Sequence, residues 1–195
     1  MKTYYSIMTA LLICTLSVNV LGQFQATMKY TLSGKEKHFK VFNDENRYRY
    51  EFNEDGQEGV VIVLNKTGEV YILMPQQKMA MKTISTSIMS MANDPVSAYD
   101  YQLQQGGIEK EVGREVINGI DCVKKELYTE SNQLLYTIWY SEKYAFPIKM
   151  VSHMDVTGNT SMELTDIKDW TPDDASFSIP EGYTIMDQKT MMPEH

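Results

Sequence analysis

Two neighbouring segments of this 195-residue chain, Val60–Leu64 and Val70–Met74, are apolar at nearly every position instead of at every second one. Both have the composition of β-strands, and the turn sequence Asn65-Lys66-Thr67-Gly68 between them predicts a hairpin. An antiparallel strand with one wet face alternates between apolar and polar residues, so these two strands must be covered on both sides. Alternation leaves open which of the two sets of alternate side chains of Val60–Leu64 faces inward, because both sets are apolar.

Strand-like runs also dominate the rest of the chain, separated by short turn sequences. The exception is a middle region, where Ile84, Ile88 and Met91 recur at helical spacing and Asp94-Pro95 has the sequence of a helix start. We therefore expect a mainly β (α+β) fold: a curved antiparallel half-barrel of about ten strands with a two-helix lid insertion, the helices covering residues 84–92 and 95–105. The segment from Thr171 onward is expected to be irregular.

The first 22 residues have the pattern of a secretory signal peptide. Lys2 precedes an apolar run from Ile7 to Leu16, and cleavage is predicted after Gly22. No later stretch reaches the length of a membrane-spanning helix. We expect a secreted protein located in the periplasm, with one domain over residues 23–187 and a frayed tail over residues 188–195.

The charge and the cysteine content limit the kinds of partner and of chemistry that are expected. Loss of Lys2 with the leader changes the formal net charge from −8 to −9, and no Lys/Arg cluster remains. Nucleic acids and anionic membrane surfaces are therefore not expected partners. Cys14 leaves with the leader, so Cys122 is the single thiol of the mature chain and is expected to be buried and inert.

The sequence contains no recognisable catalytic or metal-binding constellation. Its three histidines, His38, His153 and His195, are not bracketed by acidic residues at metal-ligand spacing, and no Gly-x-Ser-x-Gly, zinc or phosphate-loop pattern occurs. We expect no enzyme activity, no cofactor and no resident metal. His153 is predicted to point to solvent, because it alternates with the methionines of its strand.

Methionine is unusually frequent, with 12 of the 14 residues lying after the leader. Met is flexible and polarizable and is common on surfaces that adapt to apolar ligands. We therefore predict an apolar cavity lined by Val61, Val63, Tyr71, Leu73, Met79, Met81, Ile138, Met150, Met154 and Met162. The predicted lid contributes Ile84, Ile88, Met91, Tyr99 and Leu103.

Four stretches of the chain, in a fixed order, carry a resemblance to a known family. They are Val60–Met74 with Pro75 and Lys78-Met79-Ala80-Met81, then Val116–Lys125, then Ile138-Trp139-Tyr140-Ser141 with Phe146-Pro147-Ile148-Lys149, and finally Phe177, Pro180, Gly182 and Tyr183. Together they resemble the LolA/LppX-like periplasmic lipoprotein carriers, and most closely a branch known as a domain of unknown function. The sequence departs from that pattern at Ile120, where the branch has an aromatic residue, and at Ser141, where the carriers often have Asp.

The resemblance implies an incomplete antiparallel barrel around an apolar cavity, with helices as a lid. It implies a non-enzymatic protein that binds a lipid, an acyl chain or a lipidated partner, and a membrane protein as a further partner. Two alternatives stay open: a Cu(I)-binding protein that uses Met79 and Met81, whose sulfurs share one face of a strand, and a packed β-sheet interaction module without a ligand.

Overall fold

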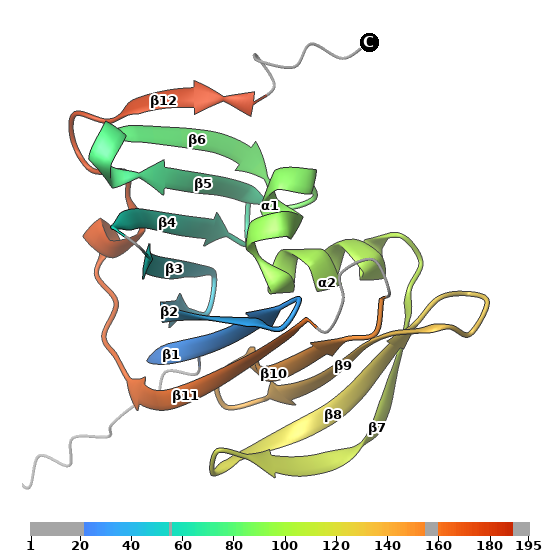
Figure 1. The fold of residues 1–195 in the computed structure, drawn as a ribbon. Coiled ribbons are helices and arrows are strands. Elements are labelled where there is room, and N and C mark those ends of the chain that lie inside the picture. The colour runs from blue at the N-terminus through green and yellow to red at the C-terminus, as the bar shows by residue number, and fades with distance from the viewer. Residues whose placement is uncertain (1–21, 55, 155–159, 189–195) are drawn as a thin grey trace, which may run out of the picture.

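Twelve strands form one continuous, curved, open sheet in the order β12-β6-β5-β4-β3-β2-β1-β11-β10-β9-β8-β7 (Figure 1). The structure is a computed structural model that describes residues 22–54, 56–154 and 160–188. The strands are β1 Gln23–Leu32, β2 Lys35–Asp44, β3 Arg47–Glu54, β4 Gln57–Leu64, β5 Glu69–Met74, β6 Met79–Ile84, β7 Ile108–Ile117, β8 Ile120–Tyr128, β9 Leu134–Ser141, β10 Phe146–Ser152, β11 Ser161–Asp169 and β12 Thr184–Asp187. Every pairing between these strands is antiparallel except that of β12 with β6, which is parallel.

Two helices, α1 (Ile88–Asn93) and α2 (Pro95–Gln104), connect β6 to β7 and lie on one face of the sheet (Figure 1). The mainly β architecture with a two-helix insertion is therefore confirmed. The first helix begins later than predicted, because Ile84 still belongs to β6 and pairs with Glu69 of β5. Ser87 caps α1, with its hydroxyl oxygen accepting a hydrogen bond from the Ser90 backbone N–H at 3.1 Å.

The doubly apolar strand β4 separates two hydrophobic clusters. Val61 and Val63 lie in the main cluster, which also holds Tyr99 of α2. Val60 and Ile62 lie in a second cluster with Phe177. Because successive side chains of a strand point to opposite faces, the two clusters cover opposite sides of the sheet. We call the side of the helices the inner face and the side of Phe177 the outer face.

A C-terminal segment covers the outer face of β3 and β4. Its 3-10 helix, η3 (Asp174–Phe177), is held by two arginines of β3. The Arg47 guanidinium lies 4.4 Å from the centre of the Phe177 ring and donates a hydrogen bond to Asp174 at 2.7 Å, and Arg49 donates to the Ser176 carbonyl at 2.6 Å. The expectation of an irregular segment after Thr171 is therefore corrected: it forms η3 and β12. With β12 the sheet has twelve strands, more than the ten predicted.

Two of the predicted segments fall largely outside the described residues. These are the leader, of which only Gly22 is described, and the tail, of which only Gln188 is described. Gln188 accepts a hydrogen bond from the Thr83 hydroxyl.

None of the helices in the described part of the chain is long and apolar enough to cross a membrane.

Replacing Phe177 by alanine tests whether the C-terminal segment is part of the core. Phe177 is buried and fills the second cluster, so Phe177→Ala is expected to lower the free energy of unfolding by about 3 to 5 kcal/mol. Urea unfolding followed by circular dichroism measures this change. The control is Thr171→Ala, an exposed position in the same segment, which is expected to change stability by less than about 0.5 kcal/mol. Equal stability of the two variants would contradict the assigned packing.

Candidate binding surface

Two rows of side chains cross the inner face from β2 to β12. The first row follows the strand register through direct partners: Val41, Tyr50, Val61, Ile72, Met81 and Met186. The second row lies two residues further along each of the same strands, where side chains point to the same face. It contains Phe39, Phe52, Gly59, Met74, Met79 and Thr184.

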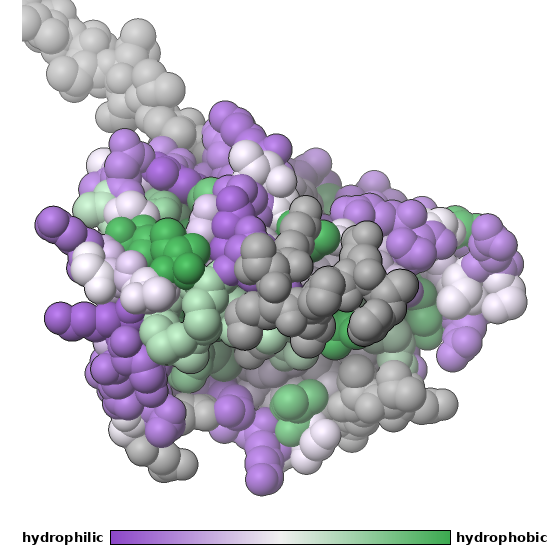
Figure 2. Space-filling view, turned by 90° about the horizontal axis from the view of Figure 1, so that it is seen from above, coloured by the Kyte–Doolittle hydropathy of each residue, from purple (hydrophilic) through white to green (hydrophobic). Residues whose placement is uncertain are grey.

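Burial decreases along the first row toward the β12 edge. Val41, Tyr50 and Val61 are fully enclosed in the main cluster. Seven further apolar side chains are only half-buried, and we call them the inner patch: Phe39, Phe52, Ile72, Met74, Met79, Met81 and Met186. Figure 2 views the molecule from the β12 side and shows hydrophobic areas there between hydrophilic ones. These partly uncovered apolar side chains make this face a candidate binding surface.

Gly59 makes room for an aromatic ring in the middle of the second row. A Cβ atom at this position would overlap the ring of Phe52, its direct partner on β3. The Phe52 ring therefore lies against the bare backbone of β4. Phe39 contacts it from β2, with ring centres 5.8 Å apart in an edge-to-face arrangement. This pair of rings forms the aromatic end of the inner patch.

Asp94 anchors the helical insertion to the sheet. Its carboxylate caps α2 by accepting hydrogen bonds from the Val96 and Ser97 backbone N–H groups at 3.0 and 3.1 Å. It also accepts hydrogen bonds from the hydroxyls of Ser97, at 2.5 Å, and of Tyr48 on β3, at 2.6 Å. Burial raises the pKa of Asp94, and the hydrogen bonds from Ser97 and Tyr48 oppose that shift.

Two small pockets flank α2 on the inner face. One has a volume of about 210 Å³ and includes Ile138 and Met150 in its lining; the other has a volume of about 200 Å³. Both include Tyr48, Asn65 and Asp100. Partial desolvation and the negative charges of Asp94 and Glu109 raise the pKa of Asp100 to about 6, although its side chain reaches solvent. Each pocket is smaller than the roughly 300 Å³ that drug-sized ligands need, so neither encloses an acyl chain.

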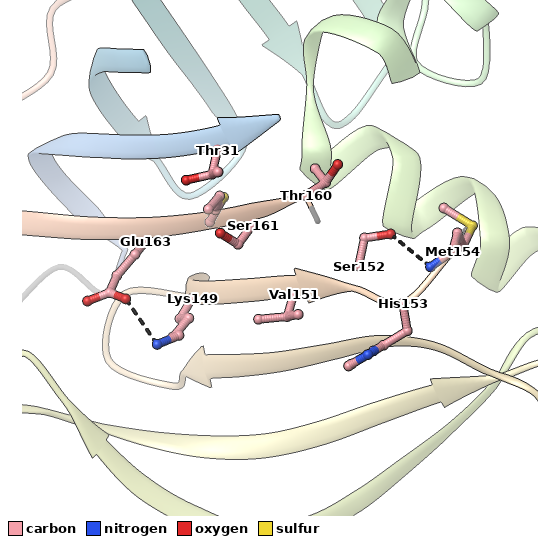
Figure 3. Close-up of a pocket in the computed structure, with 10 residues that line it drawn as sticks. Thr31, Lys149, Val151, Ser152, His153, Met154, Thr160, Ser161 and Glu163 are labelled. Atoms are coloured by element: carbon pink, nitrogen blue, oxygen red, sulfur yellow. Dashed lines mark hydrogen bonds and ion pairs between the residues drawn. The ribbon is translucent and has the colours of Figure 1, made fainter. Parts of the chain in front are cut away.

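A larger pocket, of about 610 Å³, opens on the other face of β10 and β11 (Figure 3). Its lining is mixed: Lys149 and Glu163 form an ion pair at 3.1 Å, Thr31 and Ser161 lie beside them, and the predicted cavity residues Met154 and Met162 also contribute. His153 is exposed, as predicted, and hydrogen-bonds the Thr137 hydroxyl at 2.9 Å. The ion pair in this lining makes the pocket a poorer match to a purely apolar cargo than the inner patch.

The predicted cavity residues fall into three groups. Val61, Val63, Ile138, Met150 and Met162 are buried in the main cluster. Met79, Met81 and Met154 are half-buried. Tyr71 and Leu73 belong to the second cluster on the outer face, because their direct partners on β4 are Ile62 and Val60. Their assignment to the same face as Val61 is therefore corrected.

Some of the predicted lid residues face the core and others are exposed. Tyr99 is buried in the main cluster, Leu103 packs against it, and Met91 is half-buried. Ile84 and Ile88 do not face the core, with exposed fractions of 42% and 82%. The helical spacing that joined them to Met91 fails because residue 84 ends a strand and the helix begins only at residue 88.

Five residues of the inner patch were missed by sequence reasoning: Phe39, Phe52, Ile72, Met74 and Met186. Phe39 and Phe52 alternate with polar neighbours, and that alternation was the available signal. Ile72 and Met74 lie on β5, which is apolar on both faces, so alternation could not assign them. Met186 lies on β12, which pairs with a strand a hundred residues earlier in the sequence. No local sequence pattern predicts that pairing.

The described residues hold no group of three or more His, Cys, Asp and Glu side chains that could bind a metal ion. Cys122 is buried, as predicted, and burial raises the pKa of its thiol. A raised pKa keeps the thiol protonated and poorly nucleophilic.

The similarities to known proteins concern the fold. A family model described as a domain of unknown function, DUF4412, matches residues 141–183. An uncharacterized conserved protein from Thermus thermophilus aligns with a TM-score of 0.58 and 11% identity over 87% of this chain and 93% of its own. A chain in the MucA/MucB complex of Pseudomonas aeruginosa aligns with a TM-score of 0.51 and 15% identity. That match covers 80% of this chain and 55% of the other.

A LolA superfamily protein from Nitrosomonas europaea is also among the matched structures, with a TM-score of 0.48 and 11% identity over 81% of this chain and 90% of its own. A search of the curated proteins found no match. The predicted resemblance to a branch described as a domain of unknown function is confirmed by the family model over residues 141–183. At these identities the matched structures support a shared fold and leave the activity to be inferred from the surface itself.

Removing the Asp94 carboxylate is expected to loosen the helical insertion. Asp94→Ala removes the cap of α2 and leaves the buried Tyr48 hydroxyl without its acceptor, so the free energy of unfolding should fall by about 2 to 4 kcal/mol. Urea unfolding of Asp94→Ala, Tyr48→Phe and the double variant measures the coupling between the two side chains. Gln104→Ala, exposed on the same helix, is the control. Additive effects in the double variant would contradict this anchoring role.

Proposed function

We propose that this protein is an exported, non-enzymatic binding protein that holds a lipid, an acyl chain or the lipid group of a lipidated partner against its inner patch. The observation that carries the proposal is the row of half-buried apolar side chains that continues from the closed core to the β12 edge. The leader-like start of the sequence supports an exported, periplasmic location.

The composition of the inner patch suits a flexible apolar cargo. Four of its seven residues are methionines, whose unbranched side chains adjust to ligands of different shape. An apolar contact of about 300 Å² would contribute roughly 7 kcal/mol before the entropic cost of association. Affinity of this kind needs no polar contact, so the selectivity among lipids is expected to be low.

The cargo is placed on the open part of the inner face and not beneath α2. The two pockets beside α2 are each near 200 Å³ and include polar residues, which disfavours an enclosed acyl chain there. Helices α1 and α2 then act as one wall of the surface, fixed by Asp94 and Tyr48. The MucA/MucB complex shows that a protein of similar fold is found bound to another protein, which supports including a protein among the partners.

A fluorescent long-chain fatty acid titrated into the purified chain tests this function. Met81→Glu and Met186→Glu each place a charge in the inner patch and are expected to weaken binding at least tenfold, a loss of about 1.4 kcal/mol or more. Ile185→Glu is the matched control: it adds the same charge on the same strand, but on the opposite face. Equal affinity of Met186→Glu and Ile185→Glu, or no binding by the parent, would refute the proposal.

A further inference from the structure

Four methionines gather on three adjacent strands at the open end of the inner face. Met74 on β5 is the direct partner of Met79 on β6, and Met81 on β6 is the direct partner of Met186 on β12. Met79 and Met81 lie two residues apart on one strand and so point to the same side. All four residues are half-buried.

The spacing of these strands allows several sulfurs to reach one ion. Adjacent strands lie about 5 Å apart, and alternate residues of a strand lie about 7 Å apart, so Met79, Met81 and Met186 form a compact triangle. Met74 lies on the other side of β6, next to Met79. Each methionine has three rotatable bonds with which to move its sulfur toward the centre. The sequence alone offered the Met79–Met81 pair, and the parallel pairing of β12 with β6 adds Met186 as a third ligand.

The donor set is chemically selective. Thioethers are soft, neutral ligands that favour Cu(I) over Zn²⁺ and over the harder divalent ions. The nearest basic residue of β6, Lys82, points to the other face, where it pairs with Glu69 and lies over the Tyr71 ring. Carboxylate, imidazole and thiolate groups do not occur in either inner-face row from β2 to β12.

We propose that Met74, Met79, Met81 and Met186 form a Cu(I) site in which at least three thioether sulfurs bind the ion. The ion is taken up as Cu(I), so no electron transfer is required. Because thioethers carry no proton to displace, the affinity should not change between about pH 6 and pH 8, unlike that of a site built from cysteine or histidine.

Anaerobic titration of the purified chain with Cu(I) against a chromophoric Cu(I) chelator tests the site. The parent is expected to bind one equivalent, and the triple variant Met79→Leu, Met81→Leu, Met186→Leu is expected to bind at least tenfold more weakly. Met-to-Leu changes conserve volume and apolarity, so the fold is expected to be retained, as circular dichroism can verify. Met154→Leu, half-buried near the end of β10, is the control for the loss of one thioether elsewhere and should bind as the parent does.

The same variants separate this proposal from lipid binding. The leucine triple variant keeps the apolar surface and should still bind the fluorescent fatty acid, whereas Met81→Glu and Met186→Glu should lose the fatty acid. Absence of Cu(I) binding by the parent overturns the copper site. So does unchanged affinity in the leucine triple variant, which would assign the metal to other sulfurs of the chain.

Discussion

The structure depends on the need to cover β4 and β5 on both sides. Their side chains are apolar in both directions, and water can solvate neither face without a large cost. The chain meets this need with two different segments: α2 and the main cluster on the inner face, and the C-terminal segment around Phe177 on the outer face. The second cover comes from residues more than a hundred positions later in the sequence, so the outer cluster depends on long-range contacts.

The segments that cover the two faces bury them to different extents, and the less completely covered inner face holds the proposed site. On the outer face, Arg47 and Arg49 fix η3 in place through ion-pair, stacking and backbone contacts. On the inner face, the helices are short and are held at one end of the sheet by the buried Asp94 carboxylate. The inner face beyond them, toward β12, keeps its apolar side chains only half-buried. A protein that used this sheet only for stability would gain by closing that gap.

The sequence predicted the strands and the insertion well, because each of these has a local signal. The hairpin between β4 and β5, the Asp94-Pro95 helix start and the exposure of His153 all follow from turn chemistry, capping and alternation. Three features had no local signal. Which alternate side chains of β4 face inward is set by the long-range pairing of its neighbours. Strand β6 continues to Ile84, although the spacing of residues there is helical. Strand β12 is fixed by its parallel pairing with β6. Consequently Tyr71, Leu73, Ile84 and Ile88 were assigned wrongly, and Ile72, Met74 and Met186 were missed.

The proposed role of the inner patch is to hold an apolar cargo. Native mass spectrometry of the protein purified from its own host, followed by organic extraction and lipid analysis, reads out that cargo directly. We predict a series of added masses that disappears on extraction and matches the extracted acyl lipids. A single mass equal to that of the bare mature chain, retained when the protein is mixed with lipid vesicles, would contradict this role and would leave a compact β-sheet domain without cargo.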